Sequence, residues 1–150
     1  MGTHRSDLRG IARRAMVERD FYPVFSSAAL GELSRTSAPA DGNGDPEVRD
    51  LTHWQWVSID NDDSKDLDQL TVAEAASDGI VEIRVAIADV DALVAKDSSL
   101  DAHALHNTTS VYTSGGVFPM LPDKLSTDLT SLNEHQERLA IVADMRVASD

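Results

Sequence analysis

The chain carries the sequence QLTVAEAASDGIVEIRVAIA at residues 69–88. Two apolar runs, 69–74 and 80–88, flank Ser77-Asp78-Gly79, a combination typical of a tight turn between strands. The pattern therefore predicts a β-hairpin. We expect its core residues to be Val81, Ile83, Ala86 and Ile87.

The segments after this hairpin alternate between helical and strand-like patterns. Residues 100–106 are typical of a helix and residues 110–113 of a strand, and Ser114-Gly115-Gly116 provides a turn into residues 117–122. A last apolar run at 139–147 predicts a further strand.

The residues before the hairpin divide into two parts. Apolar residues recur every three or four positions from Arg5 to Asp20, which predicts a helix, and a second helix is expected from Ser27, whose hydroxyl can cap it. Residues 36–49 contain two Pro and two Gly and predict a linker. Alternation from Trp54 to Asp60 then predicts a strand, with Trp54 and Trp56 on one face as core residues.

The composition limits the class of protein. The chain has 150 residues and no cysteine, which excludes disulfide partners and thiolate metal sites. No apolar run approaches the ~18 residues of a membrane span, so we expect no membrane partner and a cytoplasmic location. The expected fold class is mixed α/β (α+β), with short N-terminal helices followed by a domain built on a mixed sheet.

The charge of −13 is unevenly distributed. Residues 1–50 hold seven Arg and eight acids, whereas residues 51–150 hold six basic residues and eighteen acids. A protein that attracts nucleic acid by charge alone would be basic, so RNA or DNA contact would need cations at an acidic surface. A solvated acidic surface is the alternative reading of this imbalance.

The acids are densest at residues 58–69, SIDNDDSKDLDQ, where five carboxylates fall within nine residues. Such crowding predicts either a solvated acidic loop or a site for a hard divalent cation. A calcium-binding EF-hand loop is a further alternative. It is disfavoured because Lys65 replaces the turn glycine and Thr71 replaces the final glutamate.

Two histidines, His103 and His106, lie one turn apart on the helix expected at 100–106. No third ligand of suitable spacing accompanies them. We expect an exposed helix face.

The acidic segment resembles the catalytic segment of the ribonuclease II (RNB) family, in which T-I-D is followed after five residues by D-x-D-D. The matching residues are Asp60, Asp66 and Asp68, while Gln69 stands where the family usually has a fourth aspartate. The resemblance continues in order over about residues 50–147. Its further blocks are DLT at 50–52, VAIADV at 85–90, TTSVY at 108–112, FPMLP at 118–122 and DLTSL at 128–132.

This resemblance implies a 3′-to-5′ exoribonuclease that hydrolyses single-stranded RNA to nucleoside 5′-monophosphates with Mg²⁺, as two ions. It implies metal ligands at Asp60, Asp66 and Asp68, with Asp68 also the catalytic carboxylate, and it implies that Tyr112 stacks on an RNA base. Gln69 leaves two outcomes open: an active enzyme, or a catalytically impaired RNA- or partner-binding module. The implied organisation is a helical segment at 1–35, a linker at 36–49, and the first part of an RNB-like catalytic domain at 50–150.

Overall fold

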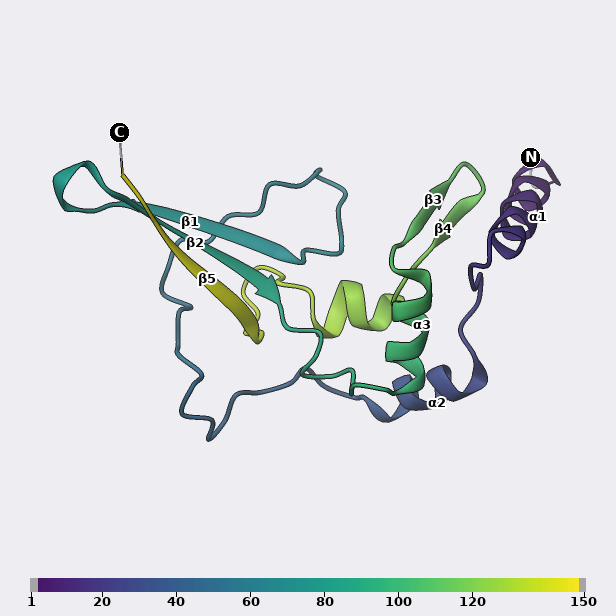
Figure 1. Ribbon diagram of the computed structural model, residues 1–150, viewed down its shortest axis with the longest axis horizontal. Coiled ribbons are helices and arrows are strands. Elements are labelled where there is room, and N and C mark those ends of the chain that lie inside the picture. Colours follow the sequence, from purple (N-terminus) through teal and green to yellow (C-terminus); the bar gives the residue numbers. More distant parts are fainter. Residues whose placement is uncertain (1–2, 149–150) are drawn as a thin grey trace. The chain divides into compact units, whose positions relative to one another are not determined.

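The computed structural model describes residues 3–148, and its elements form two compact units (Figure 1). The helical unit contains the residues up to Ser37 together with Val94–Asp123. The sheet unit contains Ala38–Leu93 together with the residues from Lys124 onward. Helices and sheets are both present, so the predicted mixed α/β class is confirmed.

The sheet unit is built on β1 (Gln69–Ala75), β2 (Val81–Ala88) and β5 (Ala140–Val147), in the order β1-β2-β5. The predicted hairpin is confirmed, and its 3₁₀ turn η1 (Ser77–Gly79) places Asp78 at φ 59° and Gly79 at φ 74°. Both strand pairs are antiparallel, so within residues 3–148 the expected mixed sheet is replaced by an antiparallel one.

The core of the sheet unit lies on one face of this sheet. Ala86, Ala88 and Leu132 are buried there, and Trp56, Leu70, Ala140 and Val142 pack against them. Ala86 was correctly predicted as core, but Val81 and Ile87 are 38% and 50% exposed. They lie an odd number of residues from Ala86, and successive side chains of a strand point to opposite faces.

The strand predicted from Trp54 to Asp60 is wrong. Its residues make a single bridge, Val57 to Thr71, with N···O distances of 2.9 and 2.8 Å. Turns replace the strand before that bridge: Asp50 accepts from the Thr52 amide at 2.9 Å, and the Trp54 amide donates to the Leu51 carbonyl at 3.3 Å. The alternation in the sequence reflects burial, because Trp54 and Trp56 are half-buried whereas Val57 is exposed.

The helical unit contains α1 (Thr3–Glu18), α2 (Ser27–Arg35) and α3 (Ser99–Asn107), as the periodicity predicts. The N-cap of α2 is Ser26, one residue before the predicted Ser27, because its hydroxyl accepts from the Ala29 amide. Glu32 of α2 accepts from the Ser99 and Leu100 amides, both at 2.9 Å. These backbone hydrogen bonds lower the pKa of Glu32.

The expectation that His103 and His106 form an exposed helix face is wrong. His103 is 5% exposed, its ring packs at a tilt against Phe25 with centroids 4.2 Å apart, and its Nε2 lies 3.2 Å from the Asn107 amide nitrogen. His106 stacks on Tyr22 at 3.7 Å. Asn107 completes this contact by bonding both the amide and the carbonyl of Tyr22 at 2.9 Å. The partners come from residues about 80 positions earlier, which local periodicity does not show.

A short hairpin, β3 (Val111–Thr113) with β4 (Gly116–Phe118), completes the helical unit. Helix α1 contacts it closely. The Arg9 guanidinium lies 5.1 Å from the Phe118 ring, and a Cβ on Gly115 would lie 2.5 Å from the Arg9 amide nitrogen. Only a residue without a side chain fits between the hairpin and the helix backbone.

The remaining segments are irregular or short. Residues 36–49 carry no helix or strand, and a π-helical turn η2 (Lys124–Leu129) belongs to the sheet unit. The domain boundaries at 35 and 49 stay a prediction. Among residues 3–148, no helix has the length and apolar character needed to cross a membrane.

We expect Gly115→Ala to lower the free energy of unfolding by about 1–3 kcal/mol, because the new methyl group would meet the backbone of α1. The matched control is Gly10→Ala inside α1, where the nearest atom lies 3.9 Å away, and this change is expected to stabilise by about 0.5–1 kcal/mol. Urea unfolding measures both. Equal effects of the two alanines would contradict the close contact.

Acid is expected to destabilise the helical unit through His103. Burial, and the nearby His106, lower the pKa of His103 below 6.5, so its neutral form is favoured in the fold. The corresponding stability is fully present above pH 6.5 and is lost as the pH falls from there towards the folded pKa. Thermal unfolding from pH 7.5 to 5 measures this loss. We expect His103→Gln to weaken the pH dependence, whereas His135→Gln, at an exposed position, leaves it unchanged. A profile that His103→Gln does not alter would contradict this assignment.

Candidate functional site

The predicted acidic site lies in the sheet unit, on the extended segment between the Val57 bridge and β1. Its five carboxylates are all exposed: Asp60, Asp62, Asp63, Asp66 and Asp68. A turn closes within this run, because the Ser64 amide donates to the Asn61 carbonyl at 3.0 Å. Exposure to water is what allows so many like charges to lie close in sequence.

The backbone beneath Asp66 and Asp68 is fixed by one buried hydroxyl. Ser131, 1% exposed, accepts from the Leu67 amide at 3.0 Å and donates towards the Lys65 carbonyl at 3.2 Å. The Leu132 amide donates to the Leu67 carbonyl at 2.7 Å. The backbone of the segment is thus held in place while its carboxylates are exposed to solvent.

The segment then joins the sheet. The Asp68 carbonyl accepts from the Ala88 amide at 2.9 Å, and Gln69 is the first residue of β1, paired with Ile87. Gln69 is exposed, like Asp68. At the other end of the acidic run, the Ser58 hydroxyl donates to the Asp60 carboxylate.

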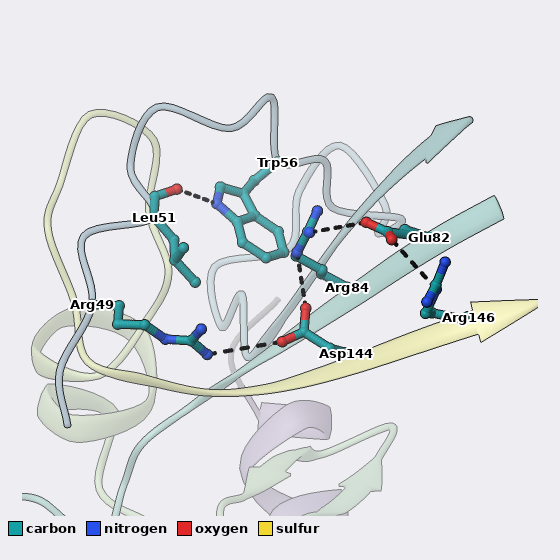
Figure 2. Close-up of polar contacts among 7 residues, drawn as sticks. All are labelled: Arg49, Leu51, Trp56, Glu82, Arg84, Asp144 and Arg146. Carbon is teal, nitrogen blue, oxygen red and sulfur yellow. Dashed lines mark hydrogen bonds and ion pairs between the residues drawn. The ribbon is translucent and has the colours of Figure 1, made fainter. Parts of the chain in front are cut away.

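The chain leading into Asp60 is held on the sheet by the polar contacts drawn in Figure 2. The Trp56 indole N–H donates to the Leu51 carbonyl at 2.9 Å, and Arg49 pairs with Asp144 at 3.8 Å. Arg84 pairs with Asp144 at 2.8 Å and lies 4.1 Å from the Trp54 ring. The partly buried pairing of Arg84 and its cation–π contact fix the turn region ahead of the acids.

The donor set suits a hard divalent cation in its chemistry, because the segment offers carboxylate oxygens and the sequence contains no thiolate. The arrangement of these oxygens supports a metal site less fully than their chemistry does. Over residues 3–148 no three His, Asp or Glu side chains converge on a common metal position. The structure places Asp66 and Asp68 on the irregular segment that Ser131 holds and Asp60 before the turn, so ligation by this trio stays a prediction.

Tyr112, the predicted RNA-stacking residue, belongs to the helical unit rather than to the unit that carries the acids. It lies on β3, paired with Val117, and is 71% exposed. The ring is accessible for stacking, but the stacking itself stays a prediction.

Sequence reasoning missed Ser131 as the residue that positions the acids. Its partners, Lys65 and Leu67, lie 66 and 64 residues earlier, and a serine in a loop carries no local sign of such contacts. Arg84 was also missed, and an arginine inside an otherwise apolar strand was the available signal.

Removing the Ser131 hydroxyl is expected to destabilise the sheet unit by about 1–3 kcal/mol, since the partly buried Leu67 amide would lose its partner. Urea unfolding of Ser131→Ala measures the destabilisation, and hydrogen exchange is expected to accelerate at Leu67. The control is Ser34→Ala, an exposed hydroxyl that bonds only within α2. A Leu67 amide that remains protected in Ser131→Ala would show that Ser131 does not hold the segment.

The sequence is similar to ribonuclease R 2 of Lactococcus lactis (42% identity over 123 residues, covering 82% of this chain) and to ribonuclease R of Mycoplasma pneumoniae (43% over 101 residues, covering 67%). The chain spans only 18% and 14% of the length of these relatives.

Solved structures of Mycoplasma genitalium RNase R share the fold. The complex with double-stranded RNA aligns with a TM-score of 0.82 at 30% identity, over 95% of this chain and 25% of that one. The apo form aligns with a TM-score of 0.75 at 32% identity, over 92% and 22% of the two chains. The profile of the RNB domain matches residues 48–150, from just before the Leu51 turn through β5. This chain therefore belongs to the RNB domain family.

Proposed function

We propose that this chain is part of a 3′-to-5′ exoribonuclease that hydrolyses single-stranded RNA to nucleoside 5′-monophosphates, with Mg²⁺ as cofactor and a cytoplasmic location. The observation that carries the proposal is the acidic segment, fixed by Ser131 and continuous with β1, in a chain of the RNB family. The relatives support it by their names, ribonuclease R and exoribonuclease 2.

In this proposal Asp60, Asp66 and Asp68 would hold Mg²⁺, as two ions, at the exposed end of the segment. Bound divalent ions supply a deprotonated water and neutralise charge on the leaving oxygen of a phosphodiester. Asp68 orients the attacking water or the metal through its carboxylate. Its backbone carbonyl is fixed by Ala88, so its side chain begins from a defined position. Tyr112 stacks on a base of the strand, a contact worth about 1–3 kcal/mol.

The second candidate is a catalytically impaired module that binds RNA or a protein partner. Gln69 favours it, because an amide offers a neutral and weaker oxygen than the carboxylate usual at this place. The glutamine lies exposed at the first position of β1, directly after Asp68. A weaker oxygen at that position would lower the affinity of the acidic segment for a divalent ion.

Hydrolysis by the longest natural form of the protein separates the two candidates. A 5′-labelled single-stranded RNA with Mg²⁺ is expected to shorten from its 3′ end and to release monophosphates. Asp68→Asn is expected to reduce the rate by about 100-fold or more, since it removes a charge that acts on the transition state. RNA that binds but is never shortened would instead support the impaired module.

Gln69→Asp is the matched variant, because it restores a fourth carboxylate without changing the pairing of β1 with β2. If the wild type is active, we expect this variant to lower the Mg²⁺ concentration needed for half-maximal rate. If the wild type is inactive, a gain of hydrolysis in Gln69→Asp identifies the glutamine as the cause.

A further inference from the structure

A cleft of about 260 Å³ opens on the sheet unit, lined by residues of the chain before the acidic segment and of β2 and β5. The charged and aromatic residues that line it are Arg49, Trp54, Glu82, Arg84, Asp144 and Arg146. Figure 2 shows the three guanidinium groups and the two carboxylates facing one another across β2, β5 and the chain before Trp56.

This cleft gathers the basic residues of an otherwise acidic unit. Among its described residues the sheet unit contains eighteen Asp and Glu but only six Lys and Arg, namely Arg49, Lys65, Arg84, Lys124, Arg138 and Arg146. Three of those six line the cleft, against two carboxylates. A strand of RNA that crosses this unit meets net positive charge here, whereas the acidic segment repels it unless cations intervene.

The three arginines are not equivalent. Arg84 has an 18% exposed side chain and is committed to Asp144 at 2.8 Å, to Glu82 at 3.4 Å and to the face of Trp54. The Arg84 guanidinium neutralises the charge of these carboxylates and stays bound to them. Because its guanidinium covers the Trp54 ring, that face is not open to a base.

Arg49 and Arg146 are held far more loosely. Their side chains are 71% and 65% exposed, and their ion pairs measure 3.8 Å to Asp144 and 3.5 Å to Glu82. Long, exposed ion pairs contribute little free energy, so exchanging them costs little. A guanidinium keeps several N–H donors beyond one such pair, and its planar fork matches two oxygens of a phosphate.

We propose that this cleft binds a phosphodiester group of an RNA strand, with Arg49 and Arg146 as the phosphate-contacting residues and Arg84 as the positioning residue. The site recognises backbone and not base sequence. This inference rests on the proposed function, which makes RNA the ligand, but it concerns binding at a place that takes no part in hydrolysis.

The test measures binding of a fluorescent single-stranded oligouridine by anisotropy, in EDTA so that the strand stays intact, over a series of NaCl concentrations. The double variant Arg49→Gln/Arg146→Gln is expected to bind about tenfold more weakly. The slope of log affinity against log salt is expected to fall in magnitude by about 0.7 for each phosphate that the variant no longer neutralises. Inorganic phosphate and uridine monophosphate serve as competitors. If either displaces the strand from the cleft at a concentration at which the strand stays bound to the rest of the protein, the cleft is assigned to a free phosphate.

Glu82→Gln is expected to change the RNA affinity in the opposite direction from the arginine variants. It removes a carboxylate that pairs with Arg146, so a phosphate site should bind the strand several-fold more tightly. If the cleft is only a structural ion-pair cluster, Glu82→Gln will leave RNA affinity unchanged or lower it, and the proposal fails. Arg49 pairs with Asp144, whereas Arg146 pairs with Glu82. If circular dichroism shows that the double variant unfolds, the RNA affinity of each single variant, Arg49→Gln and Arg146→Gln, is measured instead.

The charge-matched control is Arg14→Gln/Arg19→Gln, which removes two exposed arginines from the helical unit. An equal loss of affinity in both double variants would assign the effect to net charge and overturn the cleft. Hydrolysis in Mg²⁺ is judged separately with Asp68→Asn. A wild type that hydrolyses RNA while the cleft variants bind normally refutes this inference alone.

Discussion

The candidate site depends on one buried hydroxyl. Ser131 bonds the backbone at both Lys65 and Leu67, and with the Leu132 amide it fixes the segment from which Asp66 and Asp68 extend. A carboxylate-rich segment has little tendency to order itself, because its charges repel and its side chains prefer water. Here the backbone is ordered from beneath by neutral hydrogen bonds. The side chains can therefore stay in contact with water while the main chain is held.

The sheet unit separates its charges by region. Five exposed acids lie in the segment before β1, while three arginines lie where β2 and β5 meet the chain around Trp54. Arg84 links the two regions because it holds both Asp144 and the Trp54 ring, and the same turn leads on to Asp60. A change at Arg84 would therefore affect both the cleft and the chain that leads into Asp60.

Regular elements and the family could be predicted from the sequence, because they depend on local patterns. The hairpin at 69–88, helix 100–106 and strand 139–147 follow from periodicity and turn residues, and the acidic motif with its ordered blocks identifies the family. Long-range contacts could not be predicted. The 54–60 alternation was mistaken for a strand because burial alternates there without pairing, and His103 is buried by partners from the segment after α1. The same limit applies to the acids, whose support comes from Ser131.

The distance in sequence between Ser131 and its partners also sets an order of events during synthesis. Leu67 is made 64 residues before the serine that fixes it, and at 5–20 residues per second this is a delay of roughly 3 to 13 seconds. The β1–β2 hairpin, closed by a local turn, can form within that interval. The nascent chain therefore carries a hairpin that can already hold the Asp68 carbonyl through Ala88, whereas the backbone at Lys65 and Leu67 is fixed only once Ser131 has been added.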